Sequence, residues 1–275
     1  MRDNSKRIAP ADPAPQQAPT LDFSTPTELV DLPSKGRFYP EGHPLHGEET
    51  VEIKFMTAKD EDILTSPSLL KKGVAIDRLI QNVLLDKEIK IDTLLSGDKA
   101  AIMIASRING FGAEYKTKIN CPSCESQVAV GFDLSAIKSH DGSGYSEDEA
   151  TETGRGTFII KTPRTGFDVE VRLLTSAHEA IMLRKITRAN EKNAESTGYS
   201  DQLKMITVSV NGVNRQDLLA EFARKLPAID ARHIRKIYAK LNPGPDMKQD
   251  FRCSSCDYEK EVDIPMTVDF FWINK

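Results

Sequence analysis

Apolar and polar positions follow strand and helix periods over residues 51–84. Residues 51–55 alternate between apolar and charged side chains, which predicts a half-buried strand. Thr57, followed by the acidic pair Asp60 and Glu61, is typical of a helix N-terminus. Along residues 76–84, apolar side chains recur at intervals of three and four. That spacing predicts an amphipathic helix with one buried stripe.

Two later helices differ in how much of their surface is apolar. Asp98 is expected to cap a helix over residues 99–108 that is apolar on most sides, so this helix should be deeply buried. A short strand is predicted before it, at residues 89–91. The helix predicted over residues 231–241 has a single apolar stripe and should lie at the surface. Its opposite face carries four cations, Arg232, Arg235, Lys236 and Lys240.

The same order of patterns occurs twice along the chain. Residues 169–175 match residues 51–57 in residue class at every position, and each stretch leads into a predicted helix. Three later positions also correspond, namely Leu95, Asp98 and Ile102 with Leu226, Asp230 and Ile234. Both copies end in a Cys-x-x-Cys motif, after which apolar residues alternate in step. We therefore predict an internal duplication, with a chance alignment of short strand-helix patterns as the alternative.

The predicted fold class is α+β, with two pseudo-repeated strand-helix units joined through a four-cysteine zinc-ribbon-like site. Residues 1–27, rich in Pro, Ala and Gln, are expected to form a flexible N-terminal arm. The first repeat, with the first zinc knuckle, should span residues 28–137. The second repeat and its knuckle should span residues 157–275. Residues 138–156 between them are polar, acidic and glycine-rich, and are predicted to be a linker or surface loop.

The cysteines are the main candidates for metal ligands. The chain has only four, and they form the two motifs: Cys121, Cys124, Cys253 and Cys256. Four thiolates in two pairs suit a closed, tetrahedral and therefore structural Zn²⁺ site. If the two copies pack about a pseudo-twofold axis, their knuckles can meet and share one Zn²⁺. Glu125 and Asp257 follow the second cysteine of each pair, where many ribbons have glycine, and such residues resist a positive φ.

Two other chemistries could explain paired cysteines. Two thioredoxin-like dithiols would be expected where a strand runs into a helix, whereas alternating apolar residues follow each motif in this chain. Two disulfides would require an oxidising compartment. The N-terminus has no apolar signal core, so we expect synthesis in a reducing cytosol, which favours zinc.

Composition and charge are those of a soluble globular protein. Hydrophobic residues make up 39% of the 275 residues and charged residues 28%. A formal net charge of −4 argues against broad, unspecific binding of nucleic acid. No apolar run approaches the roughly 20 residues that a membrane-spanning helix needs.

The sequence contains no recognisable catalytic constellation. A Gly-rich phosphate loop, an HExxH motif and a GxSxG motif are all absent, and the five histidines are scattered. His43 and His46 flank a Pro-Leu pair in a turn-rich region and are expected to be loop residues. Because zinc would occupy the four thiols, we expect neither an enzymatic activity nor a small-molecule substrate.

Three features could contact a partner protein. The adjacent aromatics Phe38 and Tyr39 follow a glycine turn, although aromatics in this position more often pack under the nearest sheet. The basic face of the helix over residues 231–241 could meet a phosphate backbone or an acidic protein, or be solvated. The third feature lies near the C-terminus, where three aromatics could contact neighbours or pack on their own domain: Phe270, Phe271 and Trp272.

Short motifs in the first part of the chain also suggest a family. Residues 32–36 read Leu-Pro-Ser-Lys-Gly and are followed by Tyr39-Pro40. Residues 107–112 read Arg-Ile-Asn-Gly-Phe-Gly and precede the first Cys-Pro-Ser-Cys motif. Together these motifs resemble the baseplate hub protein family of T-even-like contractile-tailed bacteriophages. The resemblance implies a non-enzymatic structural or assembly component of the phage tail, at the baseplate or its hub, that binds other tail proteins.

The leading functional hypothesis is therefore a virion component of the tail baseplate, made in the host cytoplasm and stabilised by one structural Zn²⁺ per chain. The alternative is a nucleic-acid-binding zinc-ribbon module, motivated by the ribbon and by the basic helix face. An assembly factor that leaves before the tail is finished is a third possibility.

Overall fold

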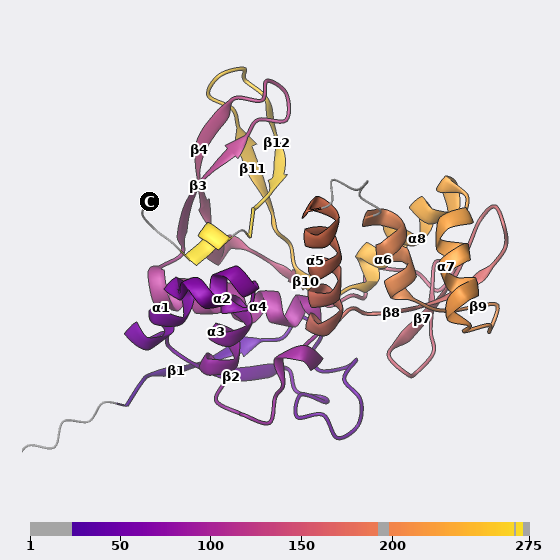
Figure 1. Cartoon of the computed structure of the whole chain (residues 1–275), viewed down its shortest axis with the longest axis horizontal. Helices are drawn as coiled ribbons and strands as arrows, with labels where there is room; N and C mark the ends of the chain where they lie inside the picture. Colours follow the sequence, from indigo (N-terminus) through magenta and orange to yellow (C-terminus); the bar gives the residue numbers. More distant parts are fainter. Residues whose placement is uncertain (1–23, 192–197, 267, 272–275) are drawn as a thin grey trace, which may run out of the picture.

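Residues 24–191, 198–266 and 268–271 are described by the computed structural model of the chain. Helices and strands both contribute, which confirms a mixed α/β architecture. In Figure 1 the first half (residues 24–137) lies at the lower left and the second half (residues 157–271) mostly at the right. Two hairpins, residues 114–133 and 248–263, rise above them and are called the tower below.

The first half begins with an antiparallel hairpin. β1 (Thr27–Asp31) pairs with β2 (Thr50–Lys54), and Val30 lies opposite Val51. The predicted alternation is confirmed, because Val51 and Ile53 are buried whereas Glu52 between them is exposed. Three helices follow the hairpin: α1 (Ala58–Thr65), α2 (Pro67–Lys72) and α3 (Ala75–Val83).

The predicted helix start at Thr57 and the predicted apolar stripe are both confirmed. The Thr57 backbone N–H and hydroxyl donate to the Asp60 carboxylate over 2.9 and 2.7 Å, as part of a capping box at the start of α1. In α3 the stripe formed by Leu79, Ile80 and Val83 is buried. These side chains belong to an apolar core that continues through both halves.

The central helix is α4 (Ser96–Phe111), which contacts elements from both halves. Two local predictions around it are wrong. The residues predicted as a strand at 89–91 lead into a 3-10 turn, η1 (Ile91–Thr93), whose backbone bonds close locally. Asp98 is not the helix cap, because Leu95 holds that position and Asp98 is the third helical residue.

Asp98 anchors the long loop between β1 and β2. Its carboxylate accepts hydrogen bonds from the Ser34 N–H (2.9 Å), the Ser34 hydroxyl (2.6 Å) and the Tyr39 hydroxyl (2.8 Å). The Tyr39 oxygen in turn accepts a hydrogen bond from the backbone N–H of Leu95. Burial raises the pKa of Asp98, although these hydrogen bonds act in the opposite direction. The loop turns at Gly36 (φ 68°), where a methyl group would overlap the backbone of Glu48.

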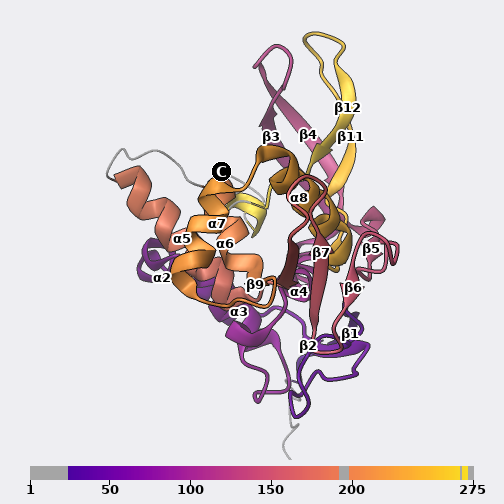
Figure 2. The ribbon, with the colours of Figure 1, turned by 90° about the vertical axis from the view of Figure 1, so that its right-hand side faces the viewer.

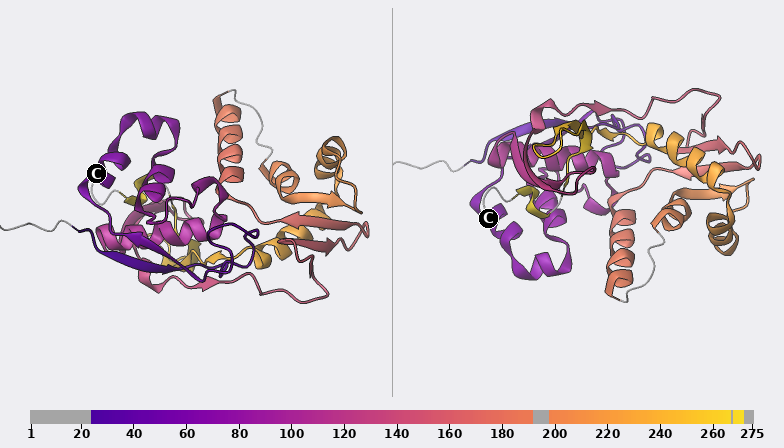
Figure 3. Two further views of the ribbon diagram at one scale, coloured as in Figure 1. Left: turned by 90° about the horizontal axis from the view of Figure 1, so that it is seen from below. Right: turned by 90° about the horizontal axis from the view of Figure 1, so that it is seen from above.

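The second half is built on a four-stranded antiparallel sheet in sequence order. Its strands are β6 (Thr151–Glu152), β7 (Thr157–Lys161), β8 (Asp168–Arg172) and β9 (Thr207–Val210). Its helices are α5 (Ser176–Glu191), α6 (Gly198–Ile206), α7 (Gln216–Lys225) and α8 (Ala228–Leu241). Viewed from below and above, α1–α3 lie toward one end, α6 and α7 toward the other, and α5 between them (Figure 3).

Residues 138–156 run over the surface between the halves. After the short turn η2 (Leu134–Ala136), β5 (Ser139–His140) pairs with β10 (Gly244–Pro245). Further along, β6 joins the edge of the second-half sheet by pairing with β7. Lys240 of α8 donates to both carboxylate oxygens of Glu149, at 2.6 and 2.7 Å. The segment therefore crosses a surface to which it is attached at several points.

The start of α4 packs directly against the second half. The Ser96 N–H donates to the Leu174 carbonyl (3.0 Å), and the Ser176 N–H donates to the Leu94 carbonyl (2.8 Å). The next residue, Gly97, lies so close to the second half that a methyl group on it would overlap the Pro243 carbonyl. A residue without a side chain is therefore required at this contact.

The C-terminal part of the chain returns to the first half. In η3 (Val268–Phe271), the Phe270 carbonyl accepts a 2.8 Å hydrogen bond from Arg107 Nε, and Phe270 packs edge-on against the Tyr115 ring at 5.0 Å. Arg107 is almost fully buried and also donates to the Gly112 and Glu114 carbonyls. These backbone acceptors attach the end of the described chain to α4.

The contact at Gly97 predicts that Gly97→Ala destabilises the protein. The added methyl group has to displace the Pro243 backbone, so we expect a loss of about 2–3 kcal/mol in the free energy of unfolding, measured by urea denaturation. Gly131→Ala in the tower is the matched control, because only the flexible end of the Glu114 side chain lies near that position. Equal stability of the two variants would contradict the proposed steric role of Gly97.

Candidate metal centre

The tower consists of two antiparallel hairpins that pack against each other. β3 (Glu114–Asn120) pairs with β4 (Gln127–Asp133), and β11 (Lys248–Arg252) pairs with β12 (Glu259–Asp263). The apolar residues that alternate after Cys124 lie in β4. Figure 2 shows both hairpins rising from the body with their connecting loops at the top. Val128 and Phe251 form a small buried cluster with Cys121 and Cys253 beneath these loops.

The two connecting loops have the same backbone geometry. Cys121 N–H donates to the Ser126 carbonyl over 2.9 Å, and Cys253 N–H donates to the Tyr258 carbonyl over 2.8 Å. In both loops the N–H two residues after the first cysteine points at its sulfur, at 3.4 Å for Ser123 and 3.3 Å for Ser255.

Each loop also turns through a residue with positive φ. These residues are Glu125 (φ 60°) and Asp257 (φ 54°), the positions that many ribbons fill with glycine. Both side chains are exposed, so neither has to be fitted into a packed interior. A non-glycine residue in this conformation is uncommon. Both loops nevertheless contain one, so the chain accepts the backbone strain of a positive φ at the turn that brings the two cysteines of each motif together.

The four cysteine sulfurs lie together at the tip of the tower. All four Sγ atoms are within 4.8 Å of one another, with 3.7 Å between Cys121 and Cys256 and 3.8 Å between Cys124 and Cys253. A tetrahedral ion with metal–sulfur bonds of about 2.3 Å requires sulfur–sulfur distances of about 3.8 Å. A disulfide would require about 2.05 Å. The donor set therefore fits one metal ion, held by two sulfurs from each half.

The sulfurs differ in how readily they lose a proton. The backbone N–H of Ser255 is the main cause that lowers the pKa of Cys253, to about 6. At Cys256 the backbone N–H of Tyr258 lowers the pKa, but the neighbouring cysteine sulfurs outweigh it and raise the pKa to about 12. Without a cation, four thiolates cannot coexist at this spacing. A bound metal ion would supply the compensating charge.

Comparison with known families agrees with this architecture. The family model described as T4 bacteriophage base plate protein matches residues 26–272, which is most of the chain. The chain belongs to the T4 bacteriophage base plate protein family. Neither a curated protein nor a solved structure matches it. Family membership makes the chain a structural phage tail component that associates with other tail proteins and resides in the virion tail.

The match covers both halves and the tower, so the cysteine cluster lies inside the family region. Within the described part of the chain, no helix combines the length and apolarity that a bilayer span would require.

The aromatic residues predicted as candidate partner contacts are mostly buried within this baseplate chain. Tyr39, Phe270 and Phe271 are each almost fully buried. Their rings therefore pack in the chain's own core, which is the alternative that the sequence left open. Phe38 is half-buried against Phe158, with ring centroids 5.7 Å apart. Trp272 lies outside the described residues.

The basic face of α8 is partly neutralised by the chain itself. Lys240 is bound to Glu149, and the Arg235 guanidinium lies over the Tyr199 ring, 4.6 Å from its centroid. Arg232 and Lys236 remain exposed. Two of the four cations predicted for a partner are thus engaged within the chain.

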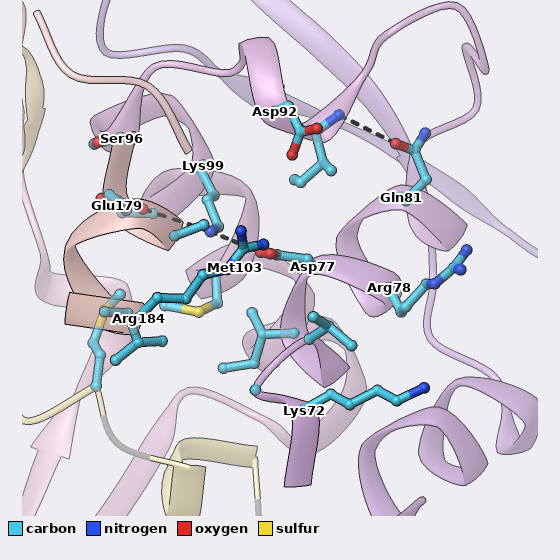
Figure 4. Close-up of a pocket in the computed structure, with 18 residues that line it drawn as sticks. Lys72, Asp77, Arg78, Gln81, Asp92, Ser96, Lys99, Met103, Glu179 and Arg184 are labelled. Carbon is cyan, nitrogen blue, oxygen red and sulfur yellow. Dashed lines mark hydrogen bonds and ion pairs between the residues drawn. The ribbon is translucent and has the colours of Figure 1, made fainter. Parts of the chain in front are cut away.

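A cavity of about 650 Å³ lies between α3 and α4 of the first half and α5 of the second. Lys99 lines it, with its ammonium 2.7 Å from Asp77 and 3.5 Å from Glu179 (Figure 4). The same ammonium is 2.8 Å from the Ser176 hydroxyl. Two carboxylates and one hydroxyl thus engage the Lys99 ammonium within the chain. The cluster links the halves, and sequence reasoning missed it because its members are far apart along the chain.

The cysteine cluster predicts that metal binding weakens in acid. Each thiol that regains a proton competes with the metal, so the apparent affinity should fall by up to about tenfold per pH unit for each protonated cysteine as the pH drops from about 8 to about 5. Competition with a chromophoric chelator at several pH values measures this dependence. An affinity that does not change with pH would exclude thiolate ligands.

Proposed function

We propose that this chain is a zinc-fastened structural component of the baseplate hub, made in the host cytoplasm and acting through protein–protein contacts without an enzymatic activity. The observation that carries the proposal is the convergence of four cysteine sulfurs, two from each half, in a family of baseplate proteins. Four sulfur donors with no other ligand favour Zn²⁺ in a closed structural site. We infer that Cys121, Cys124, Cys253 and Cys256 are its ligands, with one Zn²⁺ per chain.

We further propose that the two halves arose by internal duplication, and matching hydrogen bonds support this. In the first hairpin the Thr27 hydroxyl donates to Glu52 over 2.7 Å, and in the β7–β8 hairpin the Thr157 hydroxyl donates to Glu170 over 2.8 Å. Glu52 and Glu170 are corresponding positions of the sequence repeat. The bonds also occupy the same place in each hairpin register.

The first helix of each half starts in the same way. Thr57 donates to Asp60, and Thr175 N–H donates to His178 Nδ1 over 3.2 Å. Both acceptors stand three residues after the threonine. A carboxylate and an imidazole nitrogen thus perform the same capping task at equivalent positions, which is difficult to attribute to a chance alignment.

The buried aspartates give a third correspondence. Asp98 and Asp230 are each the third residue of the helix that precedes a knuckle. Each accepts hydrogen bonds from the loop of its own hairpin, from Ser34 in one case and from Thr165 in the other. These shared connections support the two proposed units, over residues 28–137 and 157–275, with residues 138–156 as the connection. Thr27, expected as the last residue of the arm, is the first residue of β1 and belongs with the first unit.

On this proposal the zinc acts as a clasp between the duplicated halves. Structural zinc contributes on the order of 10 kcal/mol of folding free energy. A clasp of that strength would fix the geometry of the tower when a contractile tail is under load. A nucleic-acid-binding zinc ribbon is the alternative, but the engagement of Lys240 and Arg235 within the chain leaves it less support.

Elemental analysis and thermal unfolding test the zinc clasp. We expect about one equivalent of zinc per chain. Cys121→Ser should lose much of its zinc and of its thermal stability, because one of the four sulfur ligands is removed. Ser254→Ala is the matched control, since this exposed residue lies in a knuckle loop and carries no ligand. Less than half an equivalent of zinc, or equal melting temperatures for the two variants, would contradict the proposal.

The place of the chain in the tail can be tested separately. We expect mass spectrometry of purified mature particles to detect it in a fixed ratio to other baseplate proteins. Its absence from finished particles would favour a transient assembly factor. Salt-dependent binding to DNA that falls in Arg232→Glu would favour the nucleic-acid-binding alternative.

A further inference from the structure

An apolar pocket opens at the start of α8 in the second half. It has a volume of about 450 Å³ and lies between the β7–β8 loop and α7. Its apolar walls are Phe167, Leu218, Phe222, Leu226 and Pro227. Phe167 and Phe222 meet edge to face with ring centroids 6.1 Å apart, and Leu218 is 41% exposed. The pocket is therefore preformed and open to a partner.

The corresponding place in the first half is filled by the chain itself. In the structure Leu95 corresponds to Pro227, one residue beyond the Leu226 that the sequence pattern suggested. Leu95 and Pro227 are the N-caps of α4 and α8, and each precedes the buried aspartate by three residues. In the first half, the long β1–β2 loop lays Tyr39 against Leu95 and Asp98. The His43 ring stacks on Tyr39 at 4.4 Å. The β7–β8 loop spans only residues 162–167. Its one aromatic, Phe167, stands in the pocket wall against Phe222, and the loop has no second aromatic to cover the opening.

A second difference lies two residues after each N-cap. Gly97 of α4 corresponds to Ile229 of α8, since both are second in their helices. Gly97 is covered by Pro243 and Gly244 of the second half, which leave no room for a side chain. Ile229 is 60% exposed. In the first half, Tyr39 covers the helix start at Leu95, and Pro243 and Gly244 cover it at Gly97. In the second half, the pocket beside Pro227 and the side chain of Ile229 are both open to solvent.

We propose that this α8 docking face, formed by the pocket walls and Ile229, receives an aromatic side chain from a loop of another baseplate protein. The occupant would take the place that Tyr39 holds in the first half. The proposal rests on the internal duplication proposed above, which identifies Tyr39 as the model for the missing group. The face is apolar and sits beside an ion pair between Lys225 and Glu221, so it suits a protein loop.

The chemistry of the pocket favours phenylalanine over tyrosine. In the first half the Tyr39 hydroxyl accepts a hydrogen bond from Leu95 N–H and donates to Asp98. At the equivalent position Pro227 has no N–H to donate. Asp230 Oδ2 already accepts two hydrogen bonds from Thr165, at 3.0 and 2.8 Å. A hydroxyl buried here would lack partners, which carries a penalty.

Binding of small aromatic probes to the full zinc-loaded chain tests the pocket. Fluorine NMR should show 4-fluorotoluene binding at least about fivefold more tightly than 4-fluorophenol. The binding should be lost in Leu218→Glu and kept in Val213→Glu, which changes a 44% exposed residue outside the pocket. Binding that survives Leu218→Glu, tighter binding of the phenol, or no binding to the wild type would overturn the proposal.

The partner is tested in assembling particles. In phage that depend on a supplied copy of this chain, Leu218→Glu should lower the yield of infectious particles at least about tenfold, because a charge is forced into an apolar contact, while Val213→Glu should not. A photo-crosslinker at position 218 should map to an aromatic residue in a loop of another baseplate protein. Crosslinks to a second copy of this chain, to DNA or to nothing would overturn it.

The two proposals fail separately in the same assay. Normal yield with Leu218→Glu but loss with Cys121→Ser would reject the docking face and retain the zinc clasp. Loss with Leu218→Glu but normal yield and zinc content with Cys121→Ser would do the reverse.

Discussion

The meeting of four sulfurs at the tip of the tower is the constraint on which the tower depends. A two-stranded hairpin is marginally stable alone in water. Besides the cysteines, only Val128 and Phe251 are fully buried among the described residues of the cluster between the hairpins. Burying two such side chains contributes about 3–6 kcal/mol, whereas a structural zinc site contributes on the order of 10 kcal/mol. The metal, more than apolar packing, would hold the two hairpins together.

The body of the molecule depends on different contacts. There the halves share an apolar core, the paired backbone around Ser96 and Ser176, and the ion cluster at Lys99. The carboxylates that pair with Lys99 are partly exposed to solvent, which weakens the pairs, so packing outweighs them. The halves are thus joined at the base by close packing and, with the proposed zinc bound, would also be joined at the tip by sulfur ligation. Loss of the metal would release the tower before it affects the body.

Local patterns predicted the elements whose structure is decided locally. The capping box at Thr57 and the apolar stripe of α3 depend only on neighbours in sequence, and both are confirmed. The strand predicted at residues 89–91 failed for a reason that periodicity cannot reveal. The Gln81 side chain bonds to the Ile89 carbonyl and to the Ile91 N–H, so these groups need no neighbouring strand. The sequence predicts Asp98 as a helix cap, whereas its carboxylate instead anchors the β1–β2 loop. Local patterns cannot reveal this role, because the donors come from a loop far upstream.

Gly97 and Ile229 occupy equivalent positions in the proposed duplication, but their surroundings differ. At Gly97 the carbonyl of Pro243 excludes every side chain, so the position is committed to cohesion between the halves. At Ile229 nothing in the described chain imposes that limit, and a large apolar side chain stays 60% exposed. In the first copy, the helix start is covered by the copy's own loop and by the second half. In the second copy, the same place stays open beside a preformed pocket. This asymmetry is expected of a subunit whose second copy is covered only by a partner in the assembly.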